Sequence, residues 1–260
     1  MMSELNLVEI EGGLKCYTPA GHNPVLTEAG LIYEEIFRRN VYLRGLNPID
    51  PGGVVVDAGA NIGLFTLFVK RHFPSASVLA VEPIPHNVAA LRANLDLYSV
   101  AGVTVCPVGL SDQDGSARFY FFPSMPGNST AHLANKLKDR ETVATYATTE
   151  IAEQVYRHEE VDVAVRRLSD LLRDSPHASG DIELVKMDIE GSEQAALAGL
   201  DDGDWARIKQ FAIEVHGAQD AVEAVLELLR GKGFTAQAQA ESHSPRGIDS
   251  RLVYARRQPA

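Results

Sequence analysis

The feature that most constrains this chain is a glycine-containing turn directly after a short β-branched run. Residues 54–56 read Val-Val-Val, and residues 57–63 follow as Asp-Ala-Gly-Ala-Asn-Ile-Gly. Apolar residues at helical spacing come next, up to His72. A strand that turns through glycines into a helix opens an α/β sheet, in which ligands bind beyond the carboxyl ends of the strands. The turn therefore predicts a fold class and the place of a ligand.

The rest of the chain alternates strand and helix patterns, which is typical of a doubly wound parallel sheet. Further strands are expected at residues 78–81, 103–106, 117–122, 184–189, 211–215 and 252–255. Helices are expected at residues 63–72, from Pro85 through Asn94, and at residues 193–200 and 221–230.

Two segments fall outside this alternation. Residues 1–50 are expected to form an N-terminal cap on a single main domain, residues 51–260. The stretch from about 123 to 165 is polar and then weakly helical, and it is too long for an ordinary connection. We expect it to be an inserted lid that binds substrate.

Composition limits the partners. The chain has 24 Lys and Arg against 35 Asp and Glu, a formal net charge of -11, so it should repel nucleic acid and anionic membrane surfaces. No apolar stretch approaches the roughly 20 residues of a bilayer span, and residues 1–4 lack a basic secretory leader. The two cysteines, Cys16 and Cys106, support neither a disulfide framework nor a metal site. We expect a soluble, cytoplasmic protein with no nucleic-acid or membrane partner.

The turn and the following strand together predict a nucleoside ligand. Glu82 ends the second strand, where its carboxylate can accept both hydroxyls of a ribose. A pyrophosphate site would have glycine at position 61, which here is Asn61, and Asp57 would repel phosphate. Asp57 would instead organise the turn or attract a cationic amino acid group. S-adenosylmethionine meets these conditions, because it has a ribose, an ammonium and a sulfonium but no phosphate.

Three blocks resemble one family. They are residues 57–63, the run Glu-Pro-Ile-Pro-His-Asn at residues 82–87, and the run Val-Lys-Met-Asp-Ile-Glu-Gly-Ser-Glu at residues 185–193. The chain is similar to the FkbM family of class I S-adenosylmethionine-dependent methyltransferases over about residues 30–220. The resemblance implies a Rossmann-like, mostly parallel seven-stranded sheet, S-adenosylmethionine as cofactor, and methylation of hydroxyl groups in natural product or glycan biosynthesis.

The resemblance also implies positions for the cofactor. Glu82 would hold the ribose, Gly109 and Leu110 would line the adenine, and the segment with Glu35 and Tyr42 would close over the methionine end. The cofactor loop itself would be formed by Asp57, Gly59, Asn61 and Gly63.

Polar residues follow one side of two later strands. Strand periodicity places Lys186, Asp188 and Glu190 on one side, and Glu214 and His216 share a side of the next strand. A parallel sheet covered by helices should be apolar on both faces, so this row is unusual. One interpretation is a paired interior, for instance Lys186 with Glu214.

Two catalytic interpretations of the same row stay open. Glu214 or His216 is a candidate general base for a hydroxyl acceptor, and His132 in the insertion is an alternative base. A divalent ion, Mg²⁺, could instead be held by Asp188, Glu190 and His216 and lower the hydroxyl's pKa. The candidate catalytic residues are therefore Asp188, Glu214, His216 and His132.

These features predict an O-methyltransferase that acts by direct displacement on a hydroxyl of a small metabolite, sugar or polyketide-like chain. If the acceptor chain is carrier-bound, its partner is an acyl carrier protein. Three alternatives remain: transfer to nitrogen, a nicotinamide-dependent oxidoreductase on the same type of sheet, and a nucleoside-binding protein without catalysis.

Overall fold

A central seven-stranded sheet organises the computed structural model, which describes residues 4–21, 28–177, 179–240 and 250–257. The strand order is β11-β12-β10-β9-β3-β4-β5. Neighbouring strands are parallel except at β12, which runs antiparallel to both β10 and β11. The predicted mostly parallel, Rossmann-like sheet is confirmed. Its strands are β3 (Val54–Ala58), β4 (Ser77–Val81), β5 (Val103–Cys106), β9 (Ile182–Met187), β10 (Gln210–His216), β11 (Thr235–Ala240) and β12 (Ser250–Arg256).

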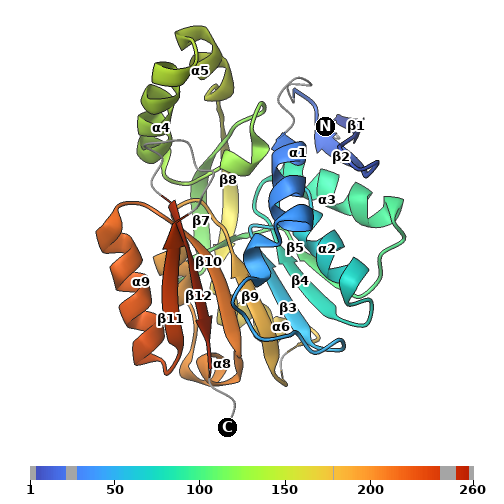
Figure 1. Cartoon of the computed structure of the whole chain (residues 1–260), viewed down its shortest axis with the longest axis vertical. Coiled ribbons are helices and arrows are strands. Elements are labelled where there is room, and N and C mark those ends of the chain that lie inside the picture. Colours follow the sequence, from blue (N-terminus) through green and yellow to red (C-terminus); the bar gives the residue numbers. More distant parts are fainter. Residues whose placement is uncertain (1–3, 22–27, 178, 241–249, 258–260) are drawn as a thin grey trace.

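Helices cover both faces of this sheet (Figure 1). Successive strand residues point to opposite faces, so Val55 packs into one hydrophobic core and Val56 into the other. The core of Val55 includes α2 (Leu64–His72) and α3 (Pro85–Leu97). The core of Val56 includes α6 (Leu168–Asp174), α7 (Glu193–Ala198), α8 (Asp202–Arg207) and α9 (Gln219–Gly231).

The N-terminal region adds to the α2 side of the sheet. It comprises the hairpin of β1 (Leu5–Glu9) and β2 (Lys15–Pro19), α1 (Glu28–Tyr33), the π-helix Glu34–Arg38 and the 3-10 helix Val41–Leu43. Ile36, Val41 and Tyr42 are buried in the same core as α2. The residues used to exclude a secretory leader fall mostly outside the described part, because residues 1–3 are not described.

A second, three-stranded sheet is separate from the main sheet, and the connection between two of its strands contains two helices (Figure 1). The sheet consists of β6 (Gly109–Leu110), β7 (Gly115–Phe121) and β8 (Glu159–Arg166). Between β7 and β8 come the 3-10 turn Pro126–Asn128, α4 (Leu133–Tyr146) and α5 (Thr149–Val155). The segment expected to be a lid therefore contains two helices and ends within β8. Its role as a lid stays a prediction.

Several boundaries differ from those expected. The strand expected over residues 184–189 ends at Met187, because Glu190 (φ 54°) and Gly191 (φ 102°) turn the chain. β8 was missed although Glu-Glu-Val-Asp-Val-Ala-Val-Arg alternates, and β11 was missed because Thr-Ala-Gln-Ala-Gln-Ala has one β-branched residue. Within the described ranges, no helix combines the length and apolarity of a membrane span.

Candidate functional site

A cavity of about 680 Å³ opens at the carboxyl ends of the central strands. Its floor comes from the segments after β3 and β4 and from the ends of β9 and β10. Its outer walls come from α1, the π-helix and the α4–α5 pair. This is where open α/β sheets bind ligands, so the cavity is the candidate active site.

The turn after β3 forms one side of the cavity. The backbone N–H of Gly59 donates to the carbonyl of Val81 at 2.9 Å, and φ at Gly59 is +75°. A Cβ on Gly59 would lie 1.8 Å from the carbonyl oxygen of Asp188, so only glycine fits between these two segments. Gly59 and Asn61 both line the cavity.

Glu82 receives hydrogen bonds from the same turn. Its carboxylate accepts from the backbone N–H of Asn61 at 2.8 Å and of Ile84 at 2.9 Å, and from Asn87 Nδ2 at 3.3 Å. Burial raises the pKa of Glu82 to about 7, although these hydrogen bonds lower it. Glu82 is 4% exposed and lines the cavity.

Two amide oxygens beside Glu82 have no hydrogen-bond partner among the described residues. They are Asn61 Oδ1 and Asn87 Oδ1, and both residues line the cavity. Buried polar atoms are normally hydrogen-bonded, so a ligand with hydroxyl or amine donors fits here. Asn87 was not predicted as a site residue, although it ends the run at residues 82–87 that resembles the family.

Two predicted members of the cofactor loop shape the turn without lining the cavity. Asp57 is fully buried and accepts a hydrogen bond from Thr66 Oγ1 at 2.7 Å. Gly63 precedes α2 with φ +89°, and a Cβ there would lie 2.4 Å from Leu91 Cδ1. These contacts are consistent with the first of the two roles considered for Asp57, organising the turn, and the absence of Asp57 from the cavity lining gives no support to the second.

Lys186 is paired with Asp57 and not with Glu214, the partner named from the sequence. Its Nζ lies 3.3 Å from Asp57 Oδ1 and donates to the carbonyl of Gly59 at 2.8 Å. The reason is the register of β3 against β9, in which Asp57 and Lys186 are direct neighbours. Burial lowers the pKa of Lys186, but Asp57 and Asp188 outweigh it and raise the pKa, so the ammonium stays charged.

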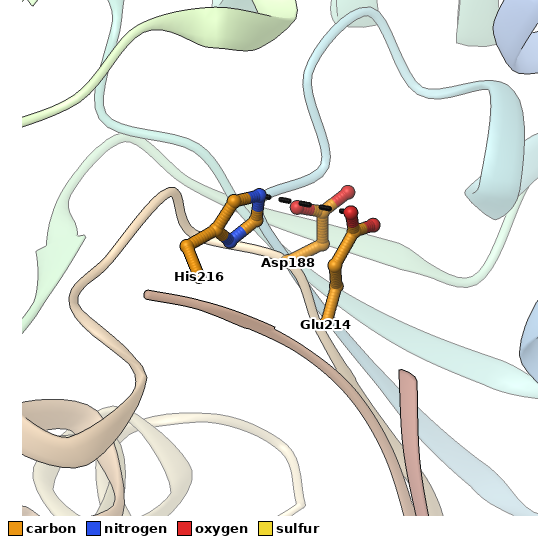
Figure 2. Close-up of side chains that lie close together, drawn as sticks. All are labelled: Asp188, Glu214 and His216. Atoms are coloured by element: carbon orange, nitrogen blue, oxygen red, sulfur yellow. Dashed lines mark ion pairs between the residues drawn. The ribbon is translucent and has the colours of Figure 1, made fainter. Parts of the chain in front are cut away.

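Three predicted catalytic residues meet on the cavity floor. Figure 2 shows Asp188, Glu214 and His216 with their side chains pointing toward one another. His216 Nε2 lies 3.7 Å from Glu214 Oε1, and one potential ligand atom from each residue lies within 4.8 Å of the others. The Tyr42 hydroxyl donates to Asp188 Oδ2 at 2.9 Å and fixes that carboxylate.

His216 is held as an imidazolium. Its Nδ1 lies 3.2 Å from Glu193 Oε1, and its Nε2 lies 3.2 Å from Glu190 Oε2. Burial lowers the pKa of His216, but the carboxylates of Glu190, Glu193 and Glu214 outweigh it and raise the pKa well above 6.5. A protonated ring donates hydrogen bonds and cannot accept the proton of a substrate.

The predicted magnesium ligands do not form one group. Glu190 was grouped with Asp188 and His216, but its carboxylate lies 2.7 Å from Lys136 Nζ, and Glu214 takes its place beside the other two. A metal would need a lone pair on His216, which the neighbouring carboxylates oppose. Mg²⁺ also prefers oxygen ligands. These residues therefore do not fit magnesium.

The remaining predicted site residues divide between the cavity and its surroundings. Gly109, Leu110 and Glu35 line the cavity, as Tyr42 does. Among the described residues predicted to act on the acceptor, only His132 lies outside the lining. Its ring packs against Gly191, and its Nε2 lies 3.3 Å from Ser192 Oγ.

Glu28 is a further buried carboxyl group that no sequence pattern indicated. It is 7% exposed, lines the cavity and accepts a hydrogen bond from the backbone N–H of Gly127 at 2.8 Å. Burial raises the pKa of Glu28 to about 8. Glu28 and Gly127 are 99 residues apart, so only the tertiary structure brings them together.

The fold is that of known methyltransferases. The structure superposes on M. jannaschii TYW2 in complex with AdoMet with a TM-score of 0.52 at 14% identity, covering 98% of this chain and 88% of that one. It superposes on Methyltransferase FkbM from Methylobacillus flagellatus KT with a TM-score of 0.53 at 18% identity, covering 82% of this chain and 46% of that one. The class of protein is thus a class I methyltransferase fold.

Sequence relatives identify the family. Residues 57–236 match the methyltransferase FkbM domain. The chain is 40% identical over 224 residues to the 31-O-demethyl-FK506 methyltransferase FkbM of Streptomyces tacrolimicus, covering 82% of this chain and 85% of the relative. It is 34% identical over 230 residues to Methyltransferase 1 of Beauveria bassiana, covering 88% and 90%. The chain belongs to the FkbM family of methyltransferases.

Proposed function

We propose that this protein transfers the methyl group of S-adenosylmethionine to a hydroxyl oxygen of its acceptor. The observation that carries the proposal is the position of Glu214, a carboxylate near the end of β10 that lines the cavity beside an imidazolium. A hydroxyl acceptor must lose its proton as it attacks, and a carboxylate at this place can accept it.

The residues around Glu82 would bind the nucleoside part of the cofactor. The Glu82 carboxylate would accept the ribose hydroxyls, and the unpartnered Oδ1 atoms of Asn61 and Asn87 would accept further donors. The AdoMet complex of TYW2, on the same fold, supports this choice of ligand. Bound S-adenosylmethionine supplies a methyl group on a positively charged sulfur, which makes it an electrophile.

The residues on the cavity floor would have different roles in proton transfer and in positioning. Glu214 would accept the hydroxyl proton, while His216 keeps its own proton and stabilises the neighbouring carboxylates. Tyr42 would hold Asp188 in place through its 2.9 Å hydrogen bond. Positioning the acceptor oxygen in line, about 3 Å from the methyl carbon, should contribute as much as proton transfer.

Transfer to oxygen, rather than to nitrogen, is supported by the name of the Streptomyces tacrolimicus relative, a 31-O-demethyl-FK506 methyltransferase. The proposed acceptor is a small metabolite, sugar or polyketide-like chain. An acyl carrier protein is the proposed partner if that chain is carrier-bound.

The experiment uses S-adenosylmethionine with an isotope-labelled methyl group and 31-O-demethyl-FK506 as the first acceptor probe, followed by a hydroxylated metabolite extract. We expect the label on an oxygen atom of a product identified by mass fragmentation. Glu214→Gln should lower kcat by about 10²- to 10⁴-fold and leave S-adenosylhomocysteine binding unchanged. Glu160→Gln, an exposed glutamate of β8, is the matched control.

Three other results would contradict the proposal. Label on nitrogen would indicate an N-methyltransferase. Cofactor binding without labelled product from either source would favour a nucleoside-binding protein without catalysis. Binding of NADH in place of S-adenosylhomocysteine in calorimetry would favour an oxidoreductase. A separate result would change only the proposed role of Glu214: activity that dialysis against EDTA abolishes and Mg²⁺ restores would show that a metal ion activates the hydroxyl.

A further inference from the structure

We propose that the outer half of the cavity is a subsite for an uncharged aliphatic group, so the acceptor is an apolar molecule that carries a hydroxyl. The outer half is the part between α1 and the α4–α5 pair. This inference rests on the proposed function and narrows its acceptor from three classes to one. Sugars and anionic metabolites are excluded as the preferred acceptors.

Apolar side chains from two distant segments form a large part of the walls of the outer half. One wall comes from α1 near the N-terminus and the other from α4 and α5, which lie above the main sheet in Figure 1. The wall residues are Leu31, Ile32, Val143, Ala147, Ile151 and Val155. Because none of these side chains carries a hydrogen-bonding group, the walls offer a ligand mainly apolar contact.

Two of the wall residues are exposed to solvent. Leu31 is 56% exposed and Ile151 is 42% exposed, although both are large aliphatic side chains. Exposed apolar surface gathered at a cavity marks a binding site, and its removal from water by an apolar ligand is favourable. An aliphatic acceptor between α1 and α5 would cover both side chains.

The charges of the cavity disfavour an anion. The lining includes the carboxyl groups of Glu34, Glu35, Asp139, Asp188, Glu190 and Glu214, whereas the raised pKa of Glu28, about 8, keeps that carboxyl group largely protonated at neutral pH. The cationic side chains of the lining are fewer: Arg39, Lys136, Lys186 and His216. The last three already lie beside carboxylates, Lys136 at 2.7 Å from Glu190, Lys186 at 3.3 Å from Asp57 and His216 at 3.2 Å from Glu193. A carboxylate or phosphate in the acceptor would therefore meet a net negative field.

The placement of polar groups disfavours a sugar. Hydrogen-bonding side chains of α1 and α4 also line the outer half, but they are engaged within the protein, Glu28 with the Gly127 N–H and Lys136 with Glu190 and Asp139. The other lining side chains of α1 and α5 are apolar. A sugar would place hydroxyls against those walls without partners, which is unfavourable. One hydroxyl at the floor with an aliphatic group outside it matches this distribution.

The test measures binding of simple alcohols by NMR with isoleucine-methyl-labelled protein saturated with S-adenosylhomocysteine. The probes are straight-chain alcohols from pentanol to octanol, with octanoate and glucose for comparison. Each added methylene should tighten binding about fourfold. The methyl signals of Ile32 and Ile151 should shift, while that of Ile213, fully buried in the main sheet, should not. Octanoate should bind more weakly than octanol, and glucose should cause no shift.

Charged substitutions on the two walls test the position of the subsite. Leu31→Asp and Ile151→Asp should each weaken octanol binding at least about tenfold and reduce its dependence on chain length. The matched controls are Leu7→Asp and Leu97→Asp, which change similarly exposed leucines (51% and 40%) away from the cavity. All four variants should bind S-adenosylhomocysteine as the wild type does, which shows that each is folded.

The proposal is overturned if affinity does not rise with chain length, if octanoate or glucose binds as well as octanol, or if wall and control variants weaken octanol binding equally. These measurements involve no methyl transfer. Labelled transfer to oxygen without chain-length-dependent alcohol binding would therefore contradict only the aliphatic subsite. Alcohol binding without any transfer would contradict only the proposed function.

Discussion

The two halves of the cavity are built in different ways. The half proposed for the cofactor, around Gly59 and Glu82, consists of main-chain turns at the sheet edge and side chains that are nearly inaccessible, such as Asn87 at 1% exposure. The acceptor half, between α1 and α5, presents Leu31 and Ile151 to solvent. The backbone therefore sets much of the shape of the half around Gly59 and Glu82, whereas side chains form most of the surface of the half between α1 and α5. Substitutions should therefore act differently on the two halves.

The largest effect is expected at Gly59 in the cofactor half. In Gly59→Ala, the new Cβ would lie 1.8 Å from the Asp188 carbonyl, so β3 and β9 would have to separate. We expect S-adenosylhomocysteine affinity to fall at least about 100-fold in calorimetry and the free energy of unfolding to fall by about 3 kcal/mol or more.

Gly13→Ala is the matched control for this substitution. Gly13 also has a positive φ, +77°, but a Cβ added there would meet no atom of a more distant residue within 4 Å. This variant should lose only about 1–2 kcal/mol through backbone strain and should bind the cofactor product normally. Equal losses in the two variants would show that the close approach to Asp188 does not matter.

An intermediate effect is expected at Glu28 in the acceptor half. Its pKa is raised to about 8, first by burial and further by Glu190 and Asp188, although Lys136 lowers it. The folded state therefore binds this proton more tightly than the unfolded state. The resulting stability is complete below about pH 4.5 and is lost as pH rises through about 8.

Glu28→Gln removes this pH dependence and keeps an amide oxygen for the Gly127 N–H. Urea unfolding should show that, from pH 5 to pH 9, the free energy of unfolding of the variant rises by on the order of 2–4 kcal/mol relative to that of the wild type. Glu9→Gln, which changes an exposed glutamate of β1, should track the wild type at every pH. A constant difference between Glu28→Gln and the wild type would contradict a raised pKa.

The smallest effect is expected at Glu82. Since burial raises the pKa of Glu82 to about 7, its carboxylate forms as pH rises from 6 to 8. If the ionised form accepts the ribose hydroxyls, S-adenosylhomocysteine should bind about tenfold tighter at pH 8 than at pH 6. Glu82→Gln should bind with the weaker affinity at both pH values. An unchanged pH dependence in that variant would assign the titration to another group.

Local pattern was enough to predict most of the main sheet and the turn after β3. The turn at residues 57–63 and the position of Glu82 depend on consecutive residues, and the glycines leave the backbone few alternatives. The strands expected around Val55, Val78 and Val103 are all present for the same reason: apolar runs bounded by turn residues identify buried strands. Edge strand β11 lacked such a run and was missed.

Contacts between distant residues could not be predicted in this way. The pairing of Lys186 with Asp57 depends on which strands are neighbours and on their register. A local sequence pattern predicts neither of these. Likewise, His216 was a candidate general base because histidine side chains often have that role. Only the positions of Glu190 and Glu193 around the ring show that it holds its proton.

The sequence by itself determined most of the sheet, the glycine-containing turn after β3 and the membership of a methyltransferase family. The sheet and the turn follow from short-range periodicity and from glycines that the backbone requires, whereas the family follows from the resemblance of three sequence blocks. The tertiary structure decided which charged side chains meet on the cavity floor and which apolar side chains line its outer walls. Those properties depend on distances of a few ångströms between residues far apart in the chain, because charge interactions and desolvation act through space and not along the sequence.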